Sequence, residues 1–507
     1  MIEGILQVDG IDGGSTALPW PVPLPQLAAT IGEQRRIMLE TIEYGINEPA
    51  YDALRLAAHI FAVVAGAISE MALAVAMERE TRLRLVGFPE IEWLRRCDDE
   101  LPVTVTPPVF NPPRSYILRR LARVASWTPW RKIPSAMVAP QATVVSHNEL
   151  LCAVAKKASI TLGFHHADAW LANRDVARRT DAGPALALCD VLSENLAQTL
   201  VVDEALTARA RLLYAANLRP LVEYAWHDLT SLSRMRLPAQ LWSGTGGSWA
   251  ARALGIEIMR RGGIMRRFDH GGGTGFIADP LWYRLGELCV TTEFTTYTPA
   301  VASILARQVN GASRAAITGA DGDPHFRLPL GRPRQSRRRP RVVYATTALH
   351  GMRRLVPLNL PDAVYVRWQI CIARTLATMN IELVLKPHPE GLLRGRTQPL
   401  SKVKPIDIRP FEQVINEADV AVFDYPASTA FWAALCTYCP VVLLDTGLTP
   451  FEEETLPLIR ERVTFVPVDF DTENRPQFSQ SELEDAVLMP RVTDPAPFRQ
   501  MLGGEYH

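Results

Sequence analysis

The stretch of sequence that decides the fold runs from Ile381 to Asp445, and it contains IELVLKPHP (381–389) and VAVFDYPAST (420–429). Its hydrophobic runs, 381–385 and 420–423, are short and rich in β-branched residues, as in strands buried on both faces of a parallel sheet. Polar residues follow each run, and ligands of open parallel sheets bind just beyond the carboxyl ends of strands. The stretch therefore predicts a Rossmann-like domain with a ligand site at these strand ends.

The polar residues at these two strand ends are suited to binding the phosphate of a nucleotide. Lys386 supplies a positive charge, and the prolines on either side of His388 keep that directional donor out of a helix. After the second strand, Asp424 precedes Ser428 and Thr429, which open a helix whose N-terminus offers free N–H groups to an anion. The alternative for the last two residues is an ordinary helix cap. We expect these residues, Lys386, His388, Asp424, Ser428 and Thr429, to bind the phosphate of a nucleotide.

A second informative segment, FDHGGGTG (268–275), follows a predicted strand at 264–268. Glycines here let the backbone approach a ligand closely. His270 is the first catalytic candidate, because imidazole titrates near neutrality and serves as a general base or phosphate partner. Asp269 and Glu293 are the other candidates, the latter because it follows a strand candidate at 290–292. The alternative is a glycine-rich turn with an incidental Asp-His pair.

A third loop, SGTGGS (243–248), also joins a predicted strand to a predicted helix. It matches neither the P-loop nor the G-x-G-x-x-G dinucleotide motif, and no lysine closes it. We interpret it as a further loop facing the ligand, with a simple tight turn as the alternative. The glycine-rich residues expected to line the cleft are Ser243, Gly244, Thr245, Gly246, Gly271 and Gly272.

Length and composition bound the class of protein. A chain of 507 residues is too long for one ordinary core, so at least two domains are expected. Lys plus Arg equals Asp plus Glu at 54 each, so the charge gives no reason to expect a nucleic-acid partner. Seven scattered cysteines and a start without a secretory signal favour the cytoplasm. The apolar run 56–76 contains a histidine and a glutamate, which favours a buried helix over a membrane span.

The order of signals along the chain predicts its domains. We expect an irregular lead-in over about 35 residues, helix from about 37 to 78, and a strand at 82–86. Strand and helix signals then suggest a Rossmann-like domain with helical insertions (1–330), a linker (331–341), a second Rossmann-like domain with the nucleotide site (342–480), and a C-terminal helix and tail (481–507). The Arg- and Pro-rich linker is interpreted as solvated. Its alternative is a basic patch that makes peripheral contact with an inner membrane.

Together these segments resemble the GT-B glycosyltransferases. More narrowly, His270-Gly271, the K-P-H-P at 386–389 and the later Asp424 with Ser428-Thr429 are similar to bacterial surface-polysaccharide transferases with cytidine-nucleotide donors. These include capsule Kdo transferases, GT-B sialyltransferases and teichoic acid glycerophosphotransferases. A family of surface-carbohydrate transferases usually has Gln before the corresponding His, and Asp269 stands there in this chain. The resemblance covers about 241–296 and 342–445, and the first 230 or so residues match no family.

The resemblance implies an α/β protein whose two Rossmann-like domains face each other across a cleft, with an extra, mainly helical N-terminal part. It implies transfer of a nonulosonic acid or Kdo from a CMP donor to a hydroxyl of a surface glycan or glycoprotein. Lys386 and His388 would meet the donor phosphate. His270 or Asp269 would deprotonate the acceptor, or Asp269 would act as nucleophile in a retaining reaction. No metal and no cofactor are expected, because the Lys, the His and the helix dipole neutralise the departing phosphate.

Three alternatives remain open at this point. The same fold could use CDP-glycerol or a UDP-sugar as its donor. It could also be a GT-B-like sugar-nucleotide epimerase. The third is an inactive paralogue that binds glycan or scaffolds an assembly complex, because Asp269 replaces the usual Gln.

Overall fold

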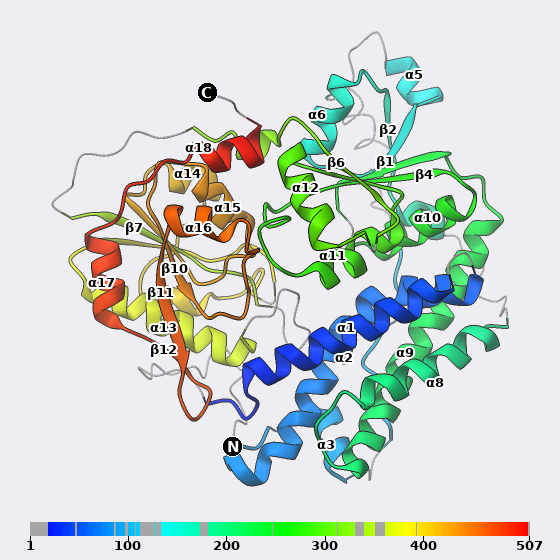
Figure 1. Cartoon of the computed structure of the whole chain (residues 1–507), viewed down its shortest axis with the longest axis horizontal. Coiled ribbons are helices and arrows are strands. Elements are labelled where there is room, and N and C mark those ends of the chain that lie inside the picture. Colours follow the sequence, from blue (N-terminus) through cyan, green and yellow to red (C-terminus); the bar gives the residue numbers. More distant parts are fainter. Residues whose placement is uncertain are drawn as a thin grey trace.

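The computed structural model describes residues 19–45, 48–85, 88–96, 100–106, 108–111, 126, 133–172, 181–245, 247–311, 313–329, 339–349, 360–391 and 393–504. Within them the protein is a mixed α/β structure with two six-stranded, largely parallel sheets and an additional helical layer. Figure 1 shows the two sheets side by side, with the helical layer beneath the first of them. The predicted α/β class with two largely parallel sheets is confirmed at this level.

The first sheet has the strand order β2-β1-β3-β4-β5-β6, and all its pairings are parallel. Its strands are β1 (Ala142–Ser146), β2 (Leu162–Phe164), β3 (Gln240–Ser243), β4 (Ile264–Phe268), β5 (Glu293–Thr296) and β6 (Ala316–Gly319). Its helices are α5 (Ile133–Val138), α6 (Glu149–Lys157), α7 (Asp168–Leu171), α10 (Trp249–Arg260), α11 (Pro280–Gly286), η3 (Leu288–Val290), α12 (Pro299–Gln308) and η4 (Pro324–Phe326).

The second sheet has the order β12-β11-β10-β9-β7-β8, and only β12 is antiparallel to its neighbour. Its strands are β7 (Arg341–Ala345), β8 (Glu382–Lys386), β9 (Val420–Phe423), β10 (Val441–Asp445), β11 (Val463–Phe470) and β12 (Pro476–Phe478). Its helices are α13 (Asp362–Thr378), η5 (Pro399–Lys402), α14 (Phe411–Ile415), α15 (Thr429–Leu435), α16 (Leu456–Arg462), α17 (Gln480–Leu488), α18 (Ala496–Phe498) and the π-helix η6 (Arg499–Gly503).

The two sheets share one topology. In each, the second strand in sequence lies outside the first, and the third lies on the first strand's other side. The direction of winding therefore reverses between β1 and β3 in the first sheet and between β7 and β9 in the second. Ligands of open parallel sheets bind at such a reversal, beyond the carboxyl ends of the strands. The topology thus marks one edge of each sheet as a candidate site.

The helical layer consists of α1 (Leu24–Tyr44), α2 (Pro49–Thr81), α3 (Pro89–Arg96), α8 (Gly183–Ala197) and α9 (Glu204–Ser233). An 18-residue window of α2 has a mean hydropathy of 2.1, enough by length and composition to cross a membrane, and 67% of it is buried inside the protein. The prediction of a buried helix at 56–76 is confirmed, as for the core helix of a soluble protein.

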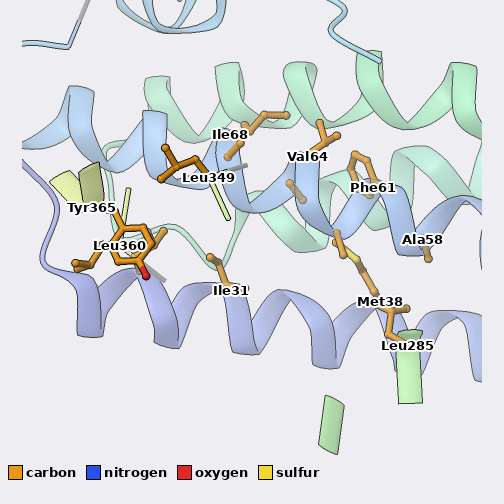
Figure 2. Close-up of a cluster of buried hydrophobic side chains, with 14 of the residues drawn as sticks. Ile31, Met38, Ala58, Phe61, Val64, Ile68, Leu285, Leu349, Leu360 and Tyr365 are labelled. Atoms are coloured by element: carbon orange, nitrogen blue, oxygen red, sulfur yellow. The ribbon is translucent and has the colours of Figure 1, made fainter. Parts of the chain in front are cut away.

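The helical layer contacts both sheet domains. In Figure 2, α1 and α2 share a cluster with Leu285 of α11 at one end and with Leu349, Leu360 and Tyr365 of the second domain at the other. Arg35 of α1 also donates to Asp279 at the start of α11, with 3.1 Å between Nη1 and Oδ2. The N-terminal helices therefore hold the two domains in a fixed relation, which the sequence did not reveal.

The two sheet domains also contact each other directly. Residues 276–278 and 450–452 form an antiparallel bridge, with Ala278 N donating to Pro450 O at 2.9 Å and Glu452 N to Phe276 O at 2.8 Å. The C-terminal segment returns to the first domain, where Asp323 N donates to the carbonyl of Leu502 at 2.8 Å. The predicted loose tail is wrong through residue 504, because η6 packs against residues 321–328.

Three further predictions differ from the structure. Helix α1 begins at Leu24 within the predicted irregular lead-in, since a proline is tolerated in the first turn of a helix. Residues 82–85 form no strand and follow directly from α2. Arg341, expected in the linker, is the first residue of β7 and pairs with Glu382 and Glu417. The other predicted linker arginines up to 338 lie outside the described residues.

Candidate functional site

The loop after β4 is organised around the buried carboxylate of Asp269. Its Oδ1 accepts hydrogen bonds from His270 N at 2.7 Å and from Thr274 Oγ1 at 2.9 Å, and its Oδ2 accepts one from Thr296 Oγ1 at 2.7 Å. The residue is 3% exposed, and burial raises the pKa of its carboxyl group to about 6. Both oxygens point into the protein. This placement favours a positioning role for Asp269 over contact with a substrate.

His270, by contrast, is exposed at the carboxyl edge of the first sheet. The glycines after it have positive φ angles, 90° at Gly271 and 89° at Gly272, which only glycine adopts without strain. Gly272 N donates to the Tyr297 hydroxyl at 2.7 Å, and the Tyr283 hydroxyl donates to Gly273 O at 3.0 Å. The loop is therefore fixed on both sides, and it presents the His270 imidazole from a rigid support.

The same loop touches the carboxyl edge of the second sheet. A Cβ built on Gly271 would lie 3.7 Å from Thr429 Oγ1, and one on Gly272 would lie 2.4 Å from Trp432 Cβ in α15. The ring of Phe276 packs 4.9 Å from that of Trp432. Glycine at 272 is thus required for close approach of the domains. His270 lies next to this contact, and Thr429 is exposed beside it.

Asp424 and Ser428 shape the loop after β9. Asp424 is 3% exposed, and its carboxylate accepts hydrogen bonds from the hydroxyls of Tyr344 at 2.5 Å and Tyr365 at 2.6 Å. Burial raises the pKa of Asp424 to about 6. Ser428 Oγ accepts from Phe431 N at 3.3 Å, so the ordinary helix cap considered for it is present. Of the donor-binding residues predicted here, Thr429 is the most exposed.

Asn148 joins three loops at the winding reversal of the first sheet. It caps α6 by accepting from Leu151 N, and its Nδ2 donates to Gly244 O at 2.9 Å and to Asp269 O at 2.7 Å. A Cβ on Gly244 would lie 2.7 Å from Asn148 N, so this glycine permits the loops after β1 and β3 to touch. Nothing in the sequence indicated that Asn148 connects these loops.

The predicted cleft loop has one further polar contact across the same edge. Ser243 Oγ donates to Thr245 O at 2.7 Å, and Thr245 Oγ1 lies 3.4 Å from Ser146 Oγ. Ser243 is buried, Thr245 is half-buried, and Ser248 at the end of the loop is exposed. Gly246 lies outside the described residues.

Lys386 and His388 lie at the carboxyl end of β8, two strands away from β9. Lys386 is 8% exposed, and burial lowers the pKa of its ammonium group. Burial also lowers the pKa of His388, whose Nδ1 accepts from Glu390 N at 3.1 Å. Because Nδ1 is an acceptor, the neutral ring carries its proton on Nε2. His388 therefore offers a donor, and the strand spacing puts it about 10 Å from the end of β9.

Glu293 is not at the end of a strand. The structure shows β5 beginning at Glu293, which pairs in register with Arg266 and lies 3.6 Å from its guanidinium Nε. The preceding Thr291 and Thr292 hydroxyls donate to the carbonyl of Met265 instead of continuing a strand. The placement of Glu293 at a carboxyl strand end is therefore wrong, and Thr296 is the last residue of that strand.

One residue near this edge was missed from the sequence. His325 in η4 lies 4.0 Å from the Glu412 carboxylate of the second domain, measured from Nε2 to Oε1, and its Nε2 is buried without a hydrogen-bond partner. Glu412 in turn acts electrostatically on Lys386. Nothing in the local sequence predicts this contact, because it forms between domains.

Comparisons with models of known protein families and with curated proteins find no match to this chain. The assignment of function therefore rests on the residues and their geometry. The loops after β4 and β9 lie against each other at Gly271 and Thr429, beside the exposed His270, and the loop after β8, two strands from β9, carries buried Lys386 and the Nε2–H donor of His388. This set can bind an anion and accept one proton.

Proposed function

We propose that the protein is a GT-B-type glycosyltransferase that moves a sugar from a CMP-linked donor to a hydroxyl of a glycan or glycoprotein acceptor. The observation that carries the proposal is the contact between the glycine loop beside His270 and the start of α15, where Thr429 lies. Two parallel sheets thereby meet through their carboxyl edges, which are the ligand-binding edges of such sheets. In this proposal the donor lies on the second domain and the acceptor on the first.

In this proposal the two histidines have different roles in the chemistry. His270 accepts the proton of the acceptor hydroxyl as the oxygen attacks the anomeric carbon. The bond from that carbon to the donor phosphate oxygen breaks, and its electron pair leaves on the phosphate of CMP. The ammonium of Lys386 and the Nε2–H of His388 stabilise this negative charge. Asp269 holds the His270 backbone through its N–H and takes no part in the bond exchange.

A thermal-shift screen with CMP, CDP, UDP and GDP tests the proposal, because a ligand that binds the folded state raises its stability according to concentration and affinity. We expect CMP to raise the unfolding midpoint more than the other nucleotides. A larger response to CDP or UDP would indicate that the donor carries that nucleotide, and it would leave the proposal of a GT-B-type transferase in place. No response to any nucleotide at millimolar concentration would contradict the proposal and favour a scaffold.

Two histidine variants separate binding from chemistry. His388→Ala is expected to lose the CMP-induced stabilisation, whereas His270→Ala should retain it and lose transfer to the acceptor. His227→Ala, on α9 of the helical layer, is the control for both measurements. Full transfer activity in both site variants would overturn the assignment of these residues.

A further inference from the structure

A cavity of about 250 Å³ lies at the opposite edge of the first sheet from His270. Its lining includes Glu43 from the end of α1, Arg55 from the first turns of α2, and Arg284 from α11. Thr291 and Arg314, which precede β5 and β6, complete its polar wall. Because the amino ends of these strands lie there, the cavity is separate from the proposed transferase site.

The charges around this cavity are unequal. Arg284 Nη2 pairs with Glu43 Oε2 at 2.5 Å, and Arg55 Nη1 pairs with Asp52 Oδ1 at 2.7 Å. Arg314 is exposed at the cavity and has no hydrogen bond or ion pair with any residue that the structure describes. Three guanidinium groups and one carboxylate therefore line the cavity, because Asp52 lies outside the lining and is shared between Arg55 and Arg260, so positive charge is in excess there.

One hydrogen-bond donor of a residue that lines the cavity also has no acceptor. The Nε of Arg284 is buried without a hydrogen-bond partner, although its neighbour Nη2 is paired with Glu43. A buried guanidinium N–H without an acceptor is costly, so an incoming anion that accepts from it is favoured. Burial raises the pKa of Glu43 although Arg284, Arg55 and Arg314 act to lower it. The carboxylate is thus poorly solvated there, and an exchange of partners is feasible.

We propose that this cavity binds a small phosphate-bearing anion through Arg284 and Arg314. The volume is below the roughly 300–1,000 Å³ typical of sites for drug-sized ligands, so a phosphate or a small phosphate monoester fits better than a nucleotide. Arginine binds phosphate through its planar set of donors. The Glu43 carboxylate accepts a hydrogen bond from Arg284 Nη2, so it competes with the ligand for that guanidinium group.

Titration calorimetry of the full chain with inorganic phosphate, at constant ionic strength set by sodium chloride, tests this site. We expect saturable binding to one site. Arg314→Gln should weaken it by about tenfold or more, the effect of one charge-assisted hydrogen bond. Glu43→Gln should act in the opposite direction and tighten binding, because it frees Arg284. The control Arg211→Gln removes an exposed, ion-paired arginine of α9 and should leave the affinity unchanged.

Two results, from the unmodified chain and from Arg314→Gln, would overturn the inference, and a third would come from His388→Ala. One is the absence of saturable phosphate binding to the unmodified chain, and the other is unchanged affinity in Arg314→Gln, whose exposed position makes correct folding of that variant expected. His388→Ala distinguishes this site from the donor site. Retained phosphate affinity in that variant supports the cavity, whereas loss of affinity would assign the phosphate to the donor loops and contradict the inference.

Discussion

The loops after β4 and β8 each carry a predicted site histidine, and they are built in different ways. The β4 loop is fixed by hydrogen bonds that side chains of Thr274 and Thr296 donate to Asp269 and that Asn148 donates to the backbone. Its backbone also donates to one tyrosine hydroxyl and accepts from another. The β8 loop has one described side-chain bond at its histidine, from Glu390 N to His388 Nδ1. A rigid support suits a residue that must be held at the reacting atom, whereas a looser loop can close on a ligand.

The largest effect is expected when the rigid loop is broken at Gly272. Gly272→Ala forces a Cβ onto Trp432 at a position with φ of 89°, so we expect a loss of about 2–4 kcal/mol in unfolding free energy. Gly262→Ala is the matched control, because its φ is 72° and nothing lies within 4 Å of the added Cβ. That control should lose about 1 kcal/mol, from backbone strain alone. If urea unfolding shows that both variants lose the same unfolding free energy, the contact with Trp432 does not contribute to the effect of Gly272→Ala.

The buried carboxyl of Asp269 predicts a pH dependence for the same loop. Its pKa is about 6 in the folded protein and near 3.8 when unfolded, so between these values the folded state holds the additional proton. The contribution of this carboxyl group to the unfolding free energy is therefore fully present below about pH 3.8, and it is lost as the pH rises through about 6. Asp269→Asn should remove this part of the decline, a difference of roughly 1–3 kcal/mol between pH 4 and 7.

Urea unfolding at several pH values measures this difference. Asp323 and Asp424 also have pKa values raised to about 6 by burial, so the variant should retain a residual decline. A pH profile for Asp269→Asn that runs parallel to that of the unmodified chain would contradict the assignment of a raised pKa to Asp269.

In the β8 loop, Lys386 is expected to lower the unfolding free energy of the protein and to contribute to nucleotide binding. Because burial lowers its pKa, the charged form is disfavoured in the folded state. Lys386→Met should raise the unfolding free energy by about 0.5–1 kcal/mol while weakening nucleotide binding. Lys402→Met, an exposed lysine of the same domain, should change neither quantity. If Lys386→Met binds nucleotide as well as the unmodified chain, Lys386 has no role at the donor phosphate.

The smallest effect on stability is expected for His388. Its half-buried ring has a single described hydrogen bond, so His388→Ala should change the unfolding free energy by no more than about 0.5 kcal/mol. The same variant should lose the stabilisation by nucleotide. A large loss of stability without ligand would show that the β8 loop is as rigid as the β4 loop and would remove the contrast between them.

Much of the fold was predictable because the residues that end its strands lie next to those strands in the sequence. The strands before His270 and His388 end at glycine- and proline-rich segments, and they were placed within one residue of β4 and β8. Glu293 was misplaced because the β-branched run before it looks like a strand, while Thr291 and Thr292 bond to Met265 from a turn. Local sequence does not distinguish these two outcomes.

The candidate site was predictable only in its local parts. Its candidate residues were found at strand ends, but their orientation depends on partners distant in the chain. Asp424 is turned inward by Tyr344 and Tyr365, which lie 80 and 59 residues away. The contact of His325 with Glu412 likewise joins two domains. Such contacts follow from tertiary packing, and no spacing in the sequence predicts them.

The most direct test of the central claim is a structure of the protein in complex with CMP. We predict that the phosphate lies between the ends of β8 and β9, in contact with His388 Nε2 and Thr429. The side of the nucleotide that the second domain leaves uncovered should face His270. A phosphate bound away from both loops, or a position from which His270 is screened by the second domain, would contradict the proposed transferase.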